Sequence, residues 1–195
     1  MSNLLTLADS INNAINTGKE ATFTYNGVLY TLSPGGIITF LNSEGKSRIL
    51  ASSAVGVTHT GDTNETVLAT VTIPAGIMGL NGALRITATW STPGGSGNNK
   101  IIRVRLGGIS GSGFMATTIT TALSYEEASR ILKNRNSATS QICRQAGSGA
   151  GSSTSAVTTI SVDTSVAQDL VFTAQLASAG ESITLEQYTV ELILP

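Results

Sequence analysis

Charged residues are scarce in this chain of 195 residues. Lys, Arg, Asp and Glu together make up 12% of it and nearly cancel, for a formal net charge of −1, whereas charged residues fill ~25% of a typical soluble domain. A general nucleic-acid binder carries a basic excess, because contacts with phosphate dominate its affinity. That excess is absent, so we expect no nucleic-acid partner.

Histidine and cysteine each occur once, as His59 and Cys143. A single cysteine forms no disulfide within the chain, and His/Cys-type metal sites need several such ligands. We expect no metal and no other cofactor. His59 stands in a polar, Thr-rich stretch, which predicts an exposed loop histidine. Cys143 lacks a CxxC partner, which predicts a small buried apolar residue.

Groupings of residues that carry catalysis are also missing. The carboxylates are scattered, with Glu126-Glu127 as a close pair, and nothing in their spacing supports a glycosidase site, which needs two carboxyl groups flanking one bond. The glycine-rich stretches GGISGSG (107–113) and GSGAGSS (147–153) lack the lysine of a phosphate-binding P-loop. We therefore expect a protein that is not an enzyme; an enzyme such as a depolymerase remains an alternative.

Long apolar runs are missing too. No stretch approaches the ~18 consecutive apolar residues of a membrane-spanning helix, so we expect no membrane partner. The first residues, MSNLLTLADSINN, have neither a basic start nor a continuous apolar run, and they do not resemble a secretory signal. These absences favour release by lysis rather than secretion.

The first 51 residues are expected to form an N-terminal piece made of a short helix and a small β-meander. Residues 4–16 place apolar side chains at helical spacing, and three of them are candidate interface residues: Leu4, Ile11 and Ile15. Asn26-Gly27 stands between two β-rich runs, which predicts a two-residue hairpin. Two further turn signals divide residues 20–51 into four short strands. The whole piece is a candidate attachment or trimer-clasping element.

From residue 55 to residue 195 the sequence shows long, regular alternation, which predicts strands with one buried and one exposed face. The expected inward-facing residues are Val67, Ala69, Val71 and Ile73; Leu84, Ile86, Ala88 and Trp90; Ile102, Val104 and Leu106; and Leu170, Phe172, Ala174 and Leu176. Strands at this spacing without intervening helices predict a mainly β fold, an antiparallel β-sandwich. Ser and Thr fill about a quarter of the chain, which suits a sheet-rich protein that stays in contact with other protein.

Two segments depart from simple alternation. In SITLEQYTVELILP (182–195) the apolar residues change from odd to even positions near Glu186-Gln187. Since a one-residue shift turns every later side chain to the other face, we predict a β-bulge there. In SYEEASRILKNR (124–135), Ser124 and Glu127 have the spacing of a helix capping box, and composition alone favours a helix.

Arg103 and Arg105 alternate with the apolar residues of KIIRVRL (100–106) and, together with Lys100, would form a basic stripe. Near-neutral net charge and a single Trp that faces the core disfavour a nucleic-acid surface. The stripe is then the exposed side of a strand, where long basic side chains cover the sheet. Because arginine is enriched at protein interfaces, Arg103 and Arg105 are candidate protein-contact residues.

Several blocks of sequence, taken in order, resemble a module that recurs in the structural proteins of tailed bacteriophages. The blocks are VTHTGDTNETVLATVTIPAGIMGLNGALRITATWS, NNKIIRVRLGG, NRNSATSQ, AVTTISVDTSVAQDLVFTAQLA and SITLEQYTVELI. The module resembles the jelly-roll sandwich of head decoration (cement) proteins, head fibres and tail or receptor-binding proteins, and it covers residues 55–195. In such proteins the segment before NRNS is a strand. The resemblance therefore implies a strand from about residue 129 and leaves 124–128 open between helix and strand.

The resemblance also implies a function and a location. It implies a bacteriophage structural protein on the surface of the virion, assembled in the host cytoplasm. The more specific expectation is a capsid decoration protein, a homotrimer that stabilises the head through contacts with the major capsid protein or another virion protein. The alternative is a tail fibre or receptor-binding protein that recognises a host surface glycan or protein.

Overall fold

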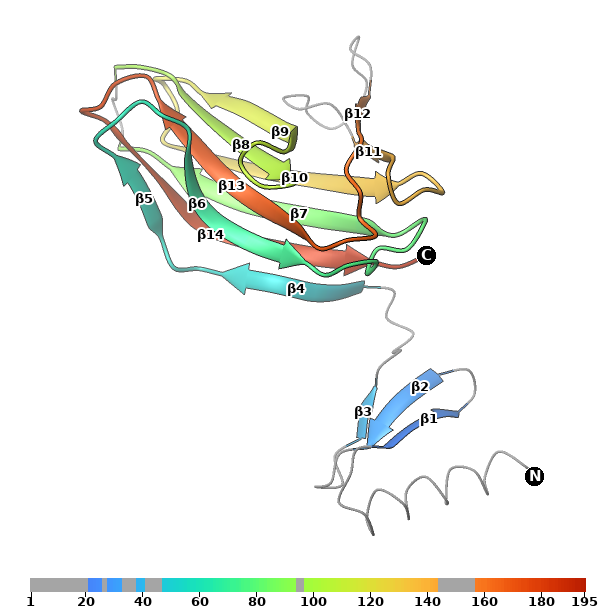
Figure 1. Ribbon diagram of the computed structural model, residues 1–195. Coiled ribbons are helices and arrows are strands. Elements are labelled where there is room, and N and C mark those ends of the chain that lie inside the picture. Colours follow the sequence, from blue (N-terminus) through green and yellow to red (C-terminus); the bar gives the residue numbers. More distant parts are fainter. Residues whose placement is uncertain (1–20, 26–27, 33–37, 41–46, 94–96, 144–156) are drawn as a thin grey trace. The chain divides into compact units, whose positions relative to one another are not determined.

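A computed structural model of the chain describes residues 21–25, 28–32, 38–40, 47–93, 97–143 and 157–195 (Figure 1). The chain divides into two compact units, Met1–Lys46 and Ser47–Pro195. The helix expected over residues 4–16, with Leu4, Ile11 and Ile15, lies outside the described residues. No helix in the described part of the chain has the length and apolar character to cross a membrane.

The first unit contains a three-stranded antiparallel sheet. Its strands are β1 (Ala21–Tyr25), β2 (Val28–Leu32) and β3 (Ile38–Phe40), in the order β1-β2-β3. Tyr25 pairs with Val28, which is the register that a two-residue hairpin connection produces. Three of the four expected meander strands are thus found in one sheet.

The fourth expected strand, β4 (Ser47–Ser53), belongs instead to the second unit, where it pairs with the last strand of the chain. The expected boundary at residue 51 therefore differs from the boundary between Lys46 and Ser47. Leu50 and Ala51 pack against the core of the second unit. A short alternating strand shows which of its residues are apolar but not which sheet it joins, and this is why the sequence placed β4 in the meander.

The second unit is built from two antiparallel sheets (Figure 1). The seven-stranded sheet has the order β12-β11-β10-β7-β14-β4, with β5 also paired to β14, and the four-stranded sheet has the order β6-β13-β8-β9. Their bounds are β5 Val57–Thr60, β6 Thr66–Ile73, β7 Ala83–Ser91, β8 Lys100–Leu106, β9 Ser112–Ile119, β10 Tyr125–Asn134, β11 Gln141–Cys143, β12 Thr158–Ile160, β13 Gln168–Leu176 and β14 Ser182–Ile193. The expected antiparallel, mainly β architecture is confirmed for the described residues.

One hydrophobic core receives side chains from both sheets. Trp90 of β7 is fully buried, and its ring lies 6.3 Å from that of Phe172 in β13 on the other sheet. Phe172 in turn stacks on Tyr188 of β14, with ring centroids 4.7 Å apart. The inward faces predicted for β7, β8 and β13 are all buried, so alternation located the core correctly in these strands.

Register shifts mark β-bulges in β4, β6, β9 and β14, and the sequence predicted the one in β14. In β14 the register to β7 shifts between Leu185 and Gln187, which confirms the predicted bulge at Glu186. In β6 the partners of Phe172 and Thr173 are Ala69 and Val67, so Leu68 is the extra residue. Leu68 is consequently buried and Val67 is 37% exposed, and the prediction that Val67 faces inward is wrong.

The segment whose composition favoured a helix is strand throughout. β10 pairs with β7 from Tyr125 to Lys133, so residues 124–128 contribute to a strand and not to a helix. Its buried positions are Ala128, Arg130, Leu132 and Asn134. Buried and exposed positions alternate regularly in this strand. Two of the four buried residues, Arg130 and Asn134, are polar, so the alternation does not show as a pattern of hydrophobicity.

Buried polar groups form a hydrogen-bonded network at the end of β10. Asn134 donates to the Gly79 carbonyl at 2.6 Å and to Thr164 Oγ1 at 3.0 Å. Gln141 Nε2 donates to Asn134 Oδ1 at 3.0 Å, and the Val162 N–H donates to Gln141 Oε1 at 3.0 Å. Since buried polar groups are costly unless bonded, this network stabilises the loops around them.

The structure confirms the prediction for the single cysteine and contradicts the prediction for the single histidine. Cys143 is a free, buried thiol, as predicted, and burial raises the pKa of that thiol. His59 is 4% exposed and lies within β5, opposite Ile183, so the prediction of an exposed loop histidine is wrong. The polar residues on either side of His59 face solvent, because side chains alternate along β5 and His59 holds its one buried position.

Candidate interaction surfaces

Arg103 and Arg105 lie on the outer face of the four-stranded sheet, where a single carboxylate binds both. Arg105 forms a bidentate pair with Glu65, with Nε–Oε1 and Nη2–Oε2 distances of 2.8 Å. Arg103 Nη1 lies 3.0 Å from Glu65 Oε2 and donates to Gln175 Oε1 at 3.1 Å. The buried Thr173 hydroxyl donates to Glu65 Oε1 at 2.6 Å. We name these five residues the arginine cluster.

The hydrogen bonds of the arginine cluster hold Glu65 in its charged form. Hydrogen bonding from Arg105 is the largest contribution; burial opposes it, and Thr173 and the charge of Arg103 add to it, so that the pKa of Glu65 falls from 4.5 to about 2. The same carboxylate raises the pKa of Arg105. All three charges are therefore present at neutral pH, and two positive charges against one negative charge leave the cluster with an excess of one positive charge.

The outward direction of the two arginines is confirmed, but neither is freely exposed. Their side chains are 20% and 21% exposed, and that of Glu65 is 19% exposed. Lys100 does not belong to a basic stripe: it occupies the inward parity of β8, is buried, and its Nζ lies 3.4 Å from Glu181 Oε2. The expected stripe is thus two arginines locked by ion pairing rather than three exposed cations.

The outer face of the seven-stranded sheet is different in character, because hydroxyl and amide groups make up much of it, beside exposed apolar side chains such as Ile49 and Ile131. Facing side chains bond across strands: Ser52 Oγ lies 3.2 Å from Thr189 Oγ1, and Thr58 Oγ1 lies 2.8 Å from Thr184 Oγ1. Gln187 Nε2 donates to Thr89 Oγ1 at 3.2 Å, and Ser91 Oγ donates to Glu186. The cation Arg85 is paired with Glu191 at 2.8 Å.

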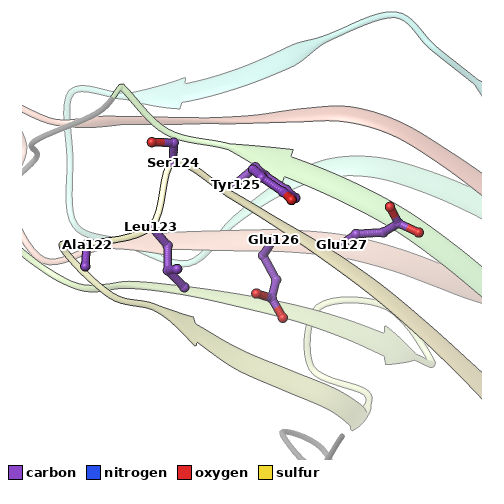
Figure 2. Close-up of a pocket in the computed structure, with 6 residues that line it drawn as sticks. All are labelled: Ala122, Leu123, Ser124, Tyr125, Glu126 and Glu127. Atoms are coloured by element: carbon purple, nitrogen blue, oxygen red, sulfur yellow. The ribbon is translucent and has the colours of Figure 1, made fainter. Parts of the chain in front are cut away.

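An open hollow of about 590 Å³ lies where β10 begins, and residues 122–127 line it. In Figure 2, Tyr125 and Glu127 point to one side of β10 and Glu126 to the other. Tyr125 is 66% exposed and Leu123 is 41% exposed. The hollow therefore presents an aromatic ring and the Glu127 carboxylate on one side of β10 and the Glu126 carboxylate on the other.

Sequence reasoning missed two residues of these surfaces. Glu65 precedes β6 and is separated from Arg105 by 40 positions, so only the sheet brings them together. Tyr125 belongs to residues 124–128, for which the sequence does not decide between helix and strand. The direction of its side chain is therefore not predicted. No group of three or more His, Cys, Asp or Glu side chains in the described ranges is placed to hold a metal ion.

No protein-family model and no curated protein sequence matches the chain. Among solved structures it is similar to dimeric latent PorU from Porphyromonas gingivalis, with 12% identity and a TM-score of 0.35 over 71% of this chain and 12% of that chain. It is also similar to the CBM2 module of the evolved Dit of Lactobacillus casei BL23 phage J-1, with 12% identity and a TM-score of 0.37 over 89% and 80% of the two chains.

A third similar structure is that of the infectious bursal disease virus Gx strain, with 9% identity and a TM-score of 0.32 over 90% of this chain and 50% of that chain. The chain thus spans 12% of the PorU chain and half of the viral chain. Two of the three structures come from a bacteriophage and a virus, but similarities at these TM-scores assign no function to this chain.

Proposed function

We propose that the protein is a structural component of a bacteriophage virion, and more specifically a capsid decoration protein that contacts the major capsid protein. The structural observation that supports this function is the arginine cluster. Its guanidinium groups are held in fixed positions on a sheet face, and arginine is favoured in protein interfaces because it combines charge, planarity and several donors. The proposal assigns the chain no catalytic activity and no cofactor.

The mode of contact follows from the charges of the cluster. Among the described residues, the side-chain partners of the Arg103 guanidinium are Glu65 and Gln175, both bonded through Nη1. We propose that its other N–H groups donate to the capsid partner and that the excess positive charge selects a carboxylate there. Since Glu65 already fixes the arginine, less conformational entropy is lost on binding. We propose a homotrimer on the particle surface as the assembled form.

The test is to locate and count the protein in purified particles by imaging and quantitative mass spectrometry. A decoration protein is expected on the head in hundreds of copies. The variant Arg103→Gln keeps the bidentate pair between Arg105 and Glu65, so it should fold normally but occupy several-fold fewer sites on the head. The matched control is Arg85→Gln, which removes an ion-paired arginine from the other sheet. Equal occupancy of the two variants would contradict the role of Arg103.

A second function, that of a tail fibre or receptor-binding protein, is supported by the hollow beside Tyr125. An exposed aromatic ring with polar groups around it is a common feature of ligand sites. Copy number separates the two functions, because a tail component is expected in a few to a few dozen copies and at the tail.

A further inference from the structure

We propose that the hollow at the start of β10, together with the hydroxyl-rich surface beside it, binds a neutral oligosaccharide. The proposal rests on the second function above for its biological setting. Its physical argument uses only the groups that the seven-stranded sheet presents.

The first part of the argument is the aromatic surface. Tyr125 is the most exposed aromatic side chain of the second unit at 66%. Leaving its ring in water is unfavourable in proportion to the apolar surface that it exposes. A sugar ring covers such a surface with its C–H face, while its hydroxyl groups remain free to bond at the edges.

The second part is the set of polar groups within reach of that ring. The register of the sheet places Tyr125 opposite Ser91 and Glu127 opposite Thr89. On the far side of β7, Thr89 pairs with Gln187, whose amide already donates to the Thr89 hydroxyl. Hydroxyl, amide and carboxylate groups therefore continue from the aromatic ring across β7 to β14, at the spacing of about 4.8 Å between neighbouring strands. A chain of sugar rings has hydroxyl groups at intervals comparable to these.

The third part is the charge of the site, which selects among sugars. Neither Glu126 nor Glu127 takes part in an ion pair among the described residues, unlike Glu65, Glu181 and Glu191. Unpaired carboxylates accept hydrogen bonds from sugar hydroxyls and repel the carboxylates of uronic and sialic acids. The site therefore fits a neutral oligosaccharide and discriminates against acidic ones.

The experiment uses the full chain as a purified protein and a panel of immobilised oligosaccharides. Neutral members contain hexoses and N-acetylhexosamines, and acidic members contain uronic or sialic acid. We expect binding to neutral members only. The tightest neutral one is then titrated by calorimetry against Tyr125→Ala, for which we expect about tenfold weaker binding, and against Tyr125→Phe, which keeps the ring and should bind like the original protein.

Two further variants complete the test. Ile131→Ala removes another exposed apolar side chain from the same face of β10 and should leave binding unchanged. The double variant Glu126→Gln, Glu127→Gln should admit acidic oligosaccharides, because it removes the repulsion. Absence of binding to every neutral oligosaccharide at millimolar concentration, a preference of the original protein for acidic ones, or equal losses in Tyr125→Ala and Ile131→Ala would each overturn the proposal. Because these assays use purified protein, their failure is separate from that of the tail function, which the location of the protein in the virion decides.

Discussion

Glu65 lies directly before β6, binds two arginines of β8, and is the residue on which the charge of one sheet face depends. Alternation predicted correctly that Arg103 and Arg105 leave the core face, since parity is a local property of a strand. It gave no information on their partner, because β6 and β8 lie on opposite sides of β13 and sequence spacing does not encode this order. The sequence therefore predicted the direction of the arginines but not their environment.

At this scale we predict how stability depends on pH. Folding lowers the pKa of Glu65 from 4.5 to about 2, so its contribution is fully present above the unfolded-state value and is lost as the pH falls through the folded-state value. Allowing for solvent screening at this partly exposed site, we expect Glu65→Gln to lower the free energy of unfolding at neutral pH by about 1–2 kcal/mol. Urea denaturation of both proteins at a series of pH values measures this difference in the free energy of unfolding.

The difference between the original protein and Glu65→Gln should shrink as the pH falls from about 5 and should be lost only below about 2, where the Glu65 carboxyl is protonated in the folded state and both side chains are uncharged. Glu127→Gln is the control, because no ion pair in the described residues involves Glu127. If the Glu65 and Glu127 variants showed the same pH profile, the ion pairing of Glu65 would not contribute to stability.

Strands differ in how far the sequence predicts them, and the differences have physical causes. β7 carries apolar residues at each inward position and β8 does so at every one except Lys100, so alternation reports burial directly in these strands. β10 buries Arg130 and Asn134, so hydrophobicity underestimates its alternation and helix propensity suggests the wrong element. In β6 the bulge at Leu68 adds a second apolar residue next to Val67, and sequence alone does not decide which of the two faces inward.

The bulge in β14 provides a prediction for this element. Deleting Glu186 removes the extra residue and leaves Leu185 next to Gln187, so the register to β7 is kept. The buried apolar residues on both sides of the deletion then alternate on one face of a straight strand: Ile183, Leu185, Val190 and Leu192. Because no apolar face is moved into solvent, we expect the deletion variant to keep a cooperative thermal transition and NMR chemical-shift dispersion. Inserting one alanine after Glu186 instead turns Val190 and Leu192 outward if the bulge is kept, or shifts their register to β7 if it is not, and it should lower the melting temperature far more than the deletion does. Loss of the cooperative transition in the deletion variant would show that β14 needs the bulge itself.

The whole molecule comprises two units, and the position of their boundary has practical consequences. The sequence anticipated a small N-terminal piece followed by a sandwich, but it assigned β4 to the former. Pairing between β4 and β14 joins residues from the two ends of the sandwich, and such non-local pairing leaves no trace in local pattern. Fold class is readable from periodicity, whereas strand order is not.

We therefore predict that a fragment covering residues 47–195 folds by itself, with a melting temperature within a few degrees of the corresponding transition in the full chain. A fragment covering residues 54–195 lacks β4 and uncovers the core beside Leu50 as well as the edge of β14. It should be less stable by roughly 1–3 kcal/mol. Differential scanning calorimetry of both fragments measures this. Equal stability of the two would mean that β4 is dispensable to the sandwich.

The position of β14 also determines when the sandwich can form during synthesis. β14 pairs with β4, β5 and β7, and without it β4 and β5 have no neighbour in the seven-stranded sheet. A ribosome adds about 5–20 residues each second, so β4 and β5 wait several seconds with open edges before their partner emerges. An unpaired strand edge can pair with another chain, and β4 and β5 stay open to such pairing until the last strand of the chain has been made and the sandwich is completed.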